Sequence, residues 1–261
     1  MYIDSHCHLN LPELASQLPD ILSRMRAADV GHALVVAVNL RDWPGLISLV
    51  ERHPHLRASV GVHPDNDAGD DDGLEPTLQD LLVRAQHPKV VAIGETGLDY
   101  SRQAEPLEWQ RDRFRLHIRA AQDSGLPLII HTRAAAEDTI RVMREARAAR
   151  GVMHCFTESW EVAQAAMGLG FHISFSGIVT FKNAAALQDV ARKVPLDRML
   201  IETDSPYLSP VPYRGKLNDP SRVIHVAEKI AELRGVPVAT IEHATAENYF
   251  SLFDKAVSIH S

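Results

Sequence analysis

No stretch of the 261-residue sequence approaches the roughly 18 consecutive apolar residues that a membrane-spanning helix needs. The first residues place Asp4 and His6 where a secretory signal would carry a basic residue and then an apolar stretch. The two cysteines, Cys7 and Cys155, are too few for a disulfide framework. These absences argue against membrane-spanning and disulfide-rich secreted proteins, and they predict a cytoplasmic protein without a membrane partner.

A basic charge balance is also missing, since the formal net charge is −7 and the isoelectric point lies near 6.0. This argues against a protein that coats nucleic acid by bulk electrostatics, although a few local cations or metal ions can still meet a phosphate substrate. No linker, low-complexity tract or solenoid repeat divides the chain, and 45% of its side chains are hydrophobic. We therefore expect one domain spanning residues 1–261.

What the sequence does contain is a series of short, apolar, β-branched runs, typical of strands buried on both faces of a parallel sheet. They span residues 2–4, 33–38, 56–62, 90–95, 127–131, 151–155, 171–175 and 199–203. Helix-like segments between them include 106–123, 135–149, 159–167, 183–193 and 220–234. Alternating strands and helices predict an α/β fold, a (β/α)₈ TIM barrel, with an open doubly wound sheet as the alternative. No GxGxxG fingerprint follows an early strand, which weakens the alternative.

Side chains able to bind metal stand at the C-terminal ends of these predicted strands. They are His6, His8, His63, Glu95, His131, His154 and Asp204. In a barrel these strand ends converge on one mouth. Because side chains alternate along a strand, His6 and His8 point the same way and can reach one ion. The joint pattern predicts a metal site with the ligands His6, His8, Glu95, His131, His154 and Asp204.

Six ligands exceed what one tetrahedral site uses, whereas a shared carboxylate would let the set hold two divalent ions. Glu95 is the predicted bridge, because its strand lies between the two pairs of histidines. Imidazoles with carboxylates suit zinc, manganese, iron or, less comfortably, magnesium, so the ligand types leave the metal open. Asp4 and Glu202 precede His6 and Asp204 by two residues, where each can orient an imidazole, hold a proton or pair with a neighbouring cation.

Longer blocks of sequence carry a family resemblance. They are "YIDSHCHLN", "GVHP", "IGETGLDY", "PLIIHTRAA", "HCF" and "LIETDSPYLSPVPYRGKLNDP". From Ile3 to about Phe250, the chain resembles the TatD family of metal-dependent deoxyribonucleases and hydrolases, within the wider amidohydrolase-like barrels. The resemblance implies a TIM barrel, divalent metal at its mouth and hydrolysis of DNA phosphodiesters, often as a 3′ exonuclease. It assigns His6, His8, Glu95 and Asp204 to a first metal position, and Glu95, His131 and His154 to a second.

The same resemblance implies groups that face the substrate phosphate. They are His63, Arg133 in "HTR", and Arg214 and Lys216 in "YRGK". Lys182 in "TFKN" is a further candidate, either as a substrate contact or as a surface cation at a helix start. For His63 we favour substrate or proton handling over metal binding.

Two departures from the family pattern concern the substrate. Thr157 and Glu158 follow "HCF", where many members have a Ser-Gly pair, and an acidic loop at 65–73 lies just beyond the "GVHP" block. An acidic loop near the mouth would oppose the binding of long DNA.

The resemblance implies phosphodiester hydrolysis of DNA, and the ligand set predicts that a water activated between two divalent ions, Mg, Mn or Zn, carries it out. Glu95, Asp204 and His63 are the predicted catalytic residues, and Asp204 is expected to hold metal and to take the proton of the water. The resemblance adds 3′-to-5′ exonuclease polarity. The expected partner is DNA or a short oligonucleotide, bound by a monomer.

Two alternatives stay open. A metal-dependent amidohydrolase or lactonase acting on a small molecule would use the same barrel, but such enzymes often bridge their ions with a modified lysine, and the strand-four position here holds Glu95. A non-catalytic binding barrel would keep its metal for stability alone, but structural zinc sites close their coordination and seldom use six ligands around an open mouth.

Overall fold

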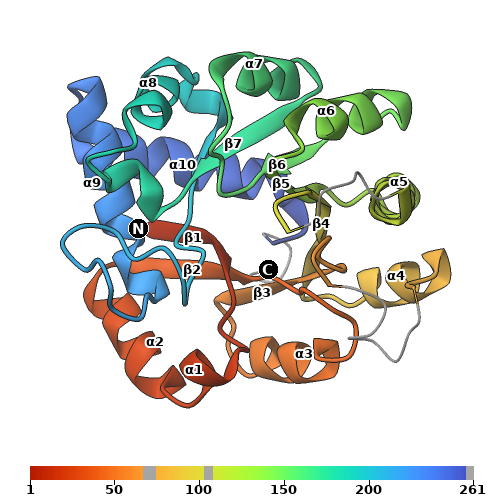
Figure 1. Cartoon of the computed structure of the whole chain (residues 1–261). Helices are drawn as coiled ribbons and strands as arrows, with labels where there is room; N and C mark the ends of the chain where they lie inside the picture. Colours follow the sequence, from red (N-terminus) through yellow and green to blue (C-terminus); the bar gives the residue numbers. More distant parts are fainter. Residues whose placement is uncertain (67–74, 103–107, 257–261) are drawn as a thin grey trace.

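Eight parallel strands, each hydrogen bonded to the next in chain order, form the centre of the protein (Figure 1). The computed structural model describes residues 1–66, 75–102 and 108–256. The strands are β1 (Tyr2–Cys7), β2 (Val30–Val35), β3 (Leu56–Val60), β4 (Val90–Asp99), β5 (Leu128–Arg133), β6 (Gly151–Met153), β7 (Phe171–Phe175) and β8 (Met199–Ile201). The sheet closes where the N–H of Asp204 donates to the carbonyl of His6 and the N–H of His8 donates to the carbonyl of Ser205. The predicted (β/α)₈ barrel is therefore confirmed, and the doubly wound alternative is wrong, because its strand order would not follow the chain.

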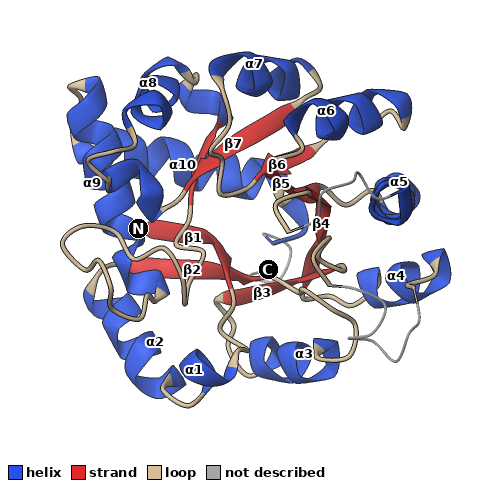
Figure 2. Cartoon of the chain, in the orientation of Figure 1, coloured by secondary structure: helices blue, strands red, loops and turns tan. Residues whose placement is uncertain are grey.

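Helices surround this barrel on the outside (Figure 2). They are α1 (Pro12–Ala15), α2 (Leu18–Ala27), α3 (Trp43–Glu51), α4 (Leu78–Ala85), α5 (Glu108–Ser124), α6 (Ala136–Glu145), α7 (Trp160–Gly168), α8 (Ala185–Lys193), α9 (Val223–Arg234) and α10 (Val238–Leu252). Short 3₁₀ turns add η1 (Gly177–Thr180), η2 (Leu196–Arg198), η3 (Pro220–Arg222) and η4 (Asp254–Ala256). Among the described helices, none has both the length and the apolar character needed to cross a bilayer.

Two of the expected strands, β1 and β4, extend further toward the mouth than the apolar runs indicated. Strand β1 continues to Cys7 and β4 continues to Asp99, so both strands carry polar residues that the apolar runs did not include. The expected helix at 106–123 is α5, whose first two expected residues lie outside the described residues. Apolar runs mark only the buried part of a strand, and the backbone ladder extends beyond it because pairing with a neighbour does not require an apolar side chain.

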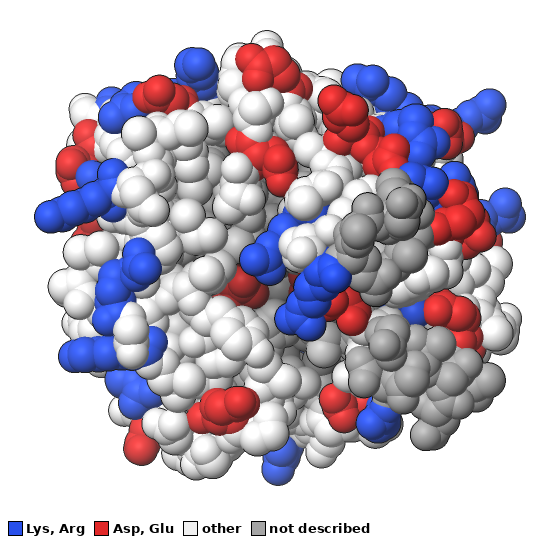
Figure 3. All heavy atoms as spheres, viewed as in Figure 1, with Lys and Arg blue, Asp and Glu red and all other residues white. Residues whose placement is uncertain are grey.

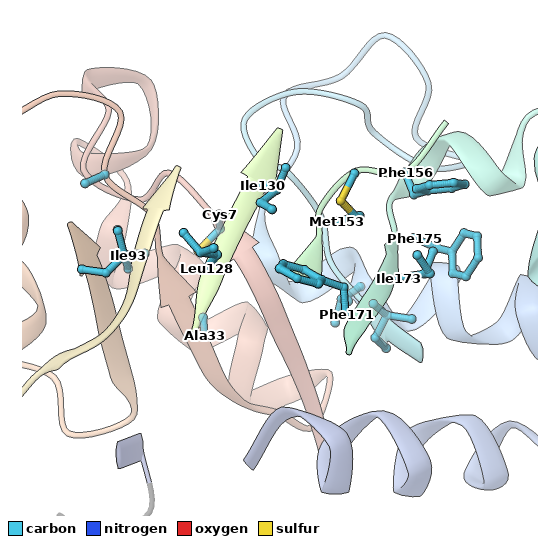
Figure 4. Packing of buried hydrophobic residues seen from close by; sticks show 14 of the residues in the cluster. Cys7, Ala33, Ile93, Leu128, Ile130, Met153, Phe156, Phe171, Ile173 and Phe175 are labelled. Atoms are coloured by element: carbon cyan, nitrogen blue, oxygen red, sulfur yellow. The ribbon is translucent and has the colours of Figure 1, made fainter. Parts of the chain in front are cut away.

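Alternation along the strands divides the core into two layers. Leu128 and Ile130 belong to the large cluster between the strands and the helices, part of which Figure 4 shows. Ile129, between them, belongs to a second cluster inside the barrel, which Tyr249 and Phe253 close at one end. Because side chains repeat every two residues, His131 shares the inward face of Ile129. The strand geometry thus directs this polar residue into the barrel mouth.

A buried arginine ties the opposite end of the barrel together. The Arg57 side chain is 0% exposed and donates hydrogen bonds to the backbone carbonyls of Pro54, Leu56 and Ala256. Burial lowers the pKa of this guanidinium from its usual value. Its N–H groups nevertheless donate hydrogen bonds to three backbone carbonyls, which stabilise the charged form. Arg57 therefore joins β3 to the last turn of the described chain.

We expect the Arg57→Met substitution to lower the free energy of unfolding by about 3 kcal/mol, because it removes charge-assisted hydrogen bonds and leaves buried carbonyls without donors. Urea unfolding followed by circular dichroism measures this loss. Arg52→Ala is the control, since Arg52 is exposed and its guanidinium Nε donates to the carbonyl of Ser48 on its own helix; it should shift stability by less than about 0.5 kcal/mol. Equal stabilities for the two variants would contradict the role given to Arg57.

Candidate metal centre

Two strand irregularities shape the mouth of the barrel. The pairing of β1 with β2 shifts between Asp4 and Cys7, and the pairing of β4 with β5 shifts between Ile93 and Thr96. Such bulges add a residue to one strand and re-aim the neighbouring side chains. The shifts coincide with the segments that carry His6 and Glu95.

The Glu95 carboxylate lies between two groups of imidazoles. Its Oε2 is 3.2 Å from His6 Nε2 and 3.9 Å from His8 Nε2. Its Oε1 is 2.7 Å from His154 Nε2 and 3.2 Å from His131 Nδ1. The side chain is only 3% exposed, so both oxygens are committed to this cluster.

Asp204 completes the first group from the other side of the mouth. It follows β8, and its Oδ1 is 3.4 Å from His8 Nε2 and 3.8 Å from His6 Nε2. The structure therefore brings all six of the expected ligands together. The donor atoms form three overlapping groups suited to a metal ion: His6, Glu95 and His154; His6, His8 and Asp204; and His63, Glu95 and His131.

Hydrogen bonds behind three imidazoles determine which ring nitrogen faces the centre. His8 Nδ1 is 3.1 Å from the carbonyl of Val36, and His131 Nε2 is 3.1 Å from Asp99 Oδ2. His154 Nδ1 is 3.2 Å from Glu202 Oε1. Since these partners only accept, each outward nitrogen carries the proton, and the inward nitrogen of the neutral ring offers a lone pair.

The converging lone pairs provide a test of whether these residues fit metal ions. His6 Nε2 and His8 Nε2 lie 3.3 Å apart, and His154 Nε2 lies 3.4 Å from His131 Nδ1. The inward nitrogens of His131 and His154 carry no proton and cannot donate to one another, and the inward nitrogen of His8 offers a lone pair to the same space, so these nitrogens gain from a cation between them. Imidazole nitrogen and carboxylate oxygen are also the donors that zinc and manganese take in proteins. The donor set fits divalent metal.

His63 has the opposite arrangement of ring protons. The backbone N–H of Asp65 donates to His63 Nδ1 at 3.0 Å, so the proton of the neutral ring is on Nε2. This Nε2 lies 3.4 Å from Glu95 Oε1 and faces the mouth as a donor. His63 thus differs from the three imidazoles with acceptors behind them, although it belongs to one of the overlapping groups.

The charges around the centre shift the pKa values of its members. Burial alone would raise the pKa of the Glu95 carboxyl, but the imidazoles of His154, His63 and His6 hold that pKa well below its ordinary value. Burial alone would lower the pKa of His154, whereas the carboxylates of Glu95 and Glu202 raise it well above its ordinary value. The ionised carboxylates therefore favour positive charge at this position, which a divalent cation supplies more fully than a proton.

The two expected supporting carboxylates act differently, since Glu202 contacts an imidazole and Asp4 binds the backbone. Glu202 is fully buried and contacts His154, and it also accepts from the N–H of Cys155 at 2.8 Å. Asp4 accepts instead from the N–H of Thr203 at 2.8 Å and from the N–H of His6 at 3.3 Å. Asp4 therefore holds the backbone of two segments that carry ligands. The shift in pairing after Asp4 turns its carboxylate toward the residues that follow β8.

Asp99 is a supporting residue that the sequence reasoning missed. Its Oδ1 accepts from the N–H and the hydroxyl of Ser101, and its backbone N–H and carbonyl both bond to the Gln110 side chain. The strand reaches this far because β4 approaches β5 closely at Gly97, where a Cβ would lie 2.0 Å from the carbonyl oxygen of His131. The available signal was the spacing of Glu95 and Asp99, which are four residues apart on one strand and so share a face.

An open cavity of about 810 Å³ lies over the cluster, and the cations around it are fewer than the sequence reasoning expected. Arg133 lines it, as does Arg102, which the sequence reasoning did not single out. The other expected cations are absent from its described lining: Lys182 is exposed, Arg214 lies 3.6 Å over the ring of Phe181, and Lys216 lies 5.7 Å over the ring of Tyr213.

The two departures from the family pattern also have positions in the structure. Thr157 lines the cavity, and burial raises the pKa of the half-buried Glu158. Of the acidic loop at 65–73, residues 67–73 lie outside the described residues. Asp65 lines the cavity and pairs with Arg102 at 3.0 Å, so this carboxylate neutralises a cation at the rim.

The chain is similar to metal-dependent hydrolases over nearly its whole length. The family model described as TatD related DNase matches residues 3–254. The uncharacterized metal-dependent hydrolase YcfH of Escherichia coli K12 is 44% identical over 256 residues, which cover 96% of this chain and 95% of the relative. The corresponding YabD of Bacillus subtilis is 41% identical over 258 residues, 97% of this chain and 99% of the relative. The crystal structure of YJJV, a TatD homolog from Escherichia coli K12, superposes with a TM-score of 0.88 at 29% identity, covering 97% of this chain and 98% of the other. The chain therefore belongs to the TatD-related DNase family of metal-dependent hydrolases.

Proposed function

We propose that this protein is a phosphodiesterase that holds two divalent metal ions, Mg, Mn or Zn, and hydrolyses DNA or short oligonucleotides from the 3′ end. The observation that carries the proposal is the position of Glu95, whose two carboxylate oxygens face separate groups of ring nitrogens. His6, His8 and Asp204 would hold the first ion with Oε2 of Glu95, and His131 and His154 the second with Oε1. A pair of divalent ions, when bound, supplies an acidified water and neutralises charge on a phosphoryl group.

The residues of the chain take distinct roles around the phosphodiester. Asp204 is the most exposed of the cluster's carboxylates, at 15% of its side chain, so it can accept the proton of the attacking water as well as bind metal. His63 donates from Nε2 toward the mouth, where an oxygen of the phosphoryl group or the leaving group would lie. Glu95 orients both groups of imidazoles and is too buried to exchange protons with solvent.

Arg133 supports a phosphate substrate despite the acidic net charge of the protein. Its side chain is exposed at the end of β5 and lines the cavity beside His131. A guanidinium presents two parallel N–H donors to phosphate oxygens, so one well-placed arginine can orient the substrate locally. A small-molecule amide or lactone would gain nothing comparable from this cation.

The metal requirement gives the first test of the function. Chelated protein should lose cleavage of end-labelled single-stranded DNA and regain it when a divalent ion is restored. Glu95→Ala should abolish turnover and reduce bound metal, measured by plasma mass spectrometry, because the shared carboxylate is lost. Glu158→Gln is the matched control, since Glu158 is outside the cluster, and it should retain metal. Rapid turnover of a cyclic amide or lactone alongside inert DNA would favour the amidohydrolase alternative.

Asp99 allows a test that does not depend on turnover. In Asp99→Asn, the N–H of Ser101 requires an oxygen at the position of Oδ1, so the amide NH₂ would face His131 Nε2 and move the ring proton to Nδ1. We expect metal affinity to fall about 10- to 100-fold, at least as much as in Asp99→Ala. Equilibrium dialysis with zinc or manganese measures it. Unchanged affinity in Asp99→Asn, matching the surface control Asp123→Asn, would contradict this role.

Arg133→Ala should raise KM for oligonucleotides about tenfold with a smaller change in kcat, because the guanidinium contributes mainly to phosphate binding. Steady-state kinetics on a short single-stranded substrate measures both constants. Arg144→Ala removes an exposed arginine from the last turn of α6 and should leave both constants unchanged. If Arg133→Ala behaves in the same way, Arg133 does not contact the substrate.

A further inference from the structure

The walls of the cavity differ in chemistry. Arg102 and Arg133, which follow or end β4 and β5, line one side. Ile178, Tyr207 and Leu208, from the segments after β7 and β8, line the other. Figure 3 shows the same contrast around the central hollow, with basic side chains on its right flank and uncharged surface on its left. The metal-binding cluster lies between an apolar wall and a wall that presents the Arg133 guanidinium beside the ion pair of Arg102 with Asp65.

Tyr207 is the most exposed large apolar side chain of the described protein, at 58%. Most large aromatic side chains in a folded protein are buried further than this, because their exposure to water is unfavourable. Tyr207 follows Asp204 by three residues in the sequence, and both residues line the cavity. An exposed ring beside a metal-binding cluster is a surface suited to a planar ligand.

The backbone beneath this ring is held firmly. The N–H of Tyr207 donates to the carbonyl of Asp204 at 3.0 Å. Asn218, fully buried, donates through Nδ2 to the carbonyls of Tyr207 and Thr203 at 2.7 and 3.0 Å. The adjoining loop packs so closely on η1 that a Cβ at Gly177 would lie 2.0 Å from the carbonyl oxygen of Leu208. The wall is therefore rigid, and little backbone ordering is required for a ligand to bind it.

We propose that Tyr207 stacks on the base of a nucleic-acid substrate at the terminal nucleotide, next to the scissile phosphate. This inference rests on the proposed function. A nucleotide matches the two walls because its base is planar and weakly polar, while its phosphates are anionic. Stacking on an aromatic ring accepts any base, since every base has a π face. An interior base of a stacked strand has both faces covered by its neighbours, whereas a terminal base has one face free for Tyr207.

Kinetics with matched substrates tests the stacking. Tyr207→Ala should raise KM about 5- to 100-fold on an oligonucleotide with an intact terminal base, and by less than about twofold on the same strand with an abasic terminal residue. Tyr207→Phe keeps the ring and should restore the wild-type value. Val211→Ala, an exposed residue of the same loop that is outside the described lining, is the control and should behave as wild type. An equal rise of KM on both substrates would overturn the proposal.

A binding measurement separates failure of this inference from failure of the proposed function. An oligonucleotide with a terminal 2-aminopurine and cleavage-resistant phosphorothioate linkages should lose fluorescence on binding to the otherwise unchanged protein, and Tyr207→Ala should abolish that quenching. If the wild-type protein cleaves DNA but the quenching does not depend on Tyr207, the stacking is wrong and the function stands. If no DNA is cleaved but quenching requires Tyr207, the base-binding wall stands without the proposed reaction. If there is neither cleavage nor quenching, both fail.

Discussion

The sharing of Glu95 between two groups of imidazoles is the interaction on which the centre depends. A buried carboxylate is costly unless its charge is paired, and five ring nitrogens surround the two oxygens of Glu95 within 3.9 Å. Neither group of imidazoles is complete without it. The ring protons are directed away from this carboxylate in His8, His131 and His154, by an acceptor behind each ring. The arrangement thus concentrates negative charge and lone pairs in one small volume, a combination that is stable only with cations.

The two ends of the barrel have different roles: one end packs apolar and aromatic side chains, and the other carries the candidate metal ligands. At the end far from the mouth, Arg57 and the aromatic residues of α10 fill and close the interior, which packs this end without residues of the mouth. At the mouth, bulges in β1 and β4 replace regular pairing and turn polar side chains inward. Backbone bonds from Asp204 and His8 then join β8 to β1 beside the ligands themselves. The bonds that close the barrel therefore also hold the segments that carry the candidate ligands.

The fold and the clustering of the candidate ligands were predictable from sequence because both follow from periodicity. Eight apolar runs indicated the strands, and reading the residue at the end of each run found His131, His154 and Asp204 without coordinates. What periodicity cannot provide is the direction of a proton or the course of a loop. Asp99 shares a face with Glu95 but lies beyond the apolar part of β4, where the expected strand had ended, and Tyr207 lies in an irregular segment with no period. The reversed ring of His63 depends on one backbone N–H, that of Asp65, which has no sequence signature. Cytoplasmic location and a monomeric state stay predictions.

An acidic protein can bind a polyanion only through cations that lie close to the bound ligand. At a net charge of −7, long-range attraction to DNA is absent, and screening at physiological salt limits any charge to about 8 Å. Within that distance the substrate would meet bound cations, Arg133 and the donor nitrogen of His63, and beyond it mostly repulsion. Long DNA would then bind weakly along its length while its terminal nucleotide binds well. The same balance gives an apolar contact such as Tyr207 more influence, because stacking is nearly independent of salt whereas phosphate contacts are not. For the proposed function, this charge distribution would favour short contacts at one nucleotide over extended contacts along a strand.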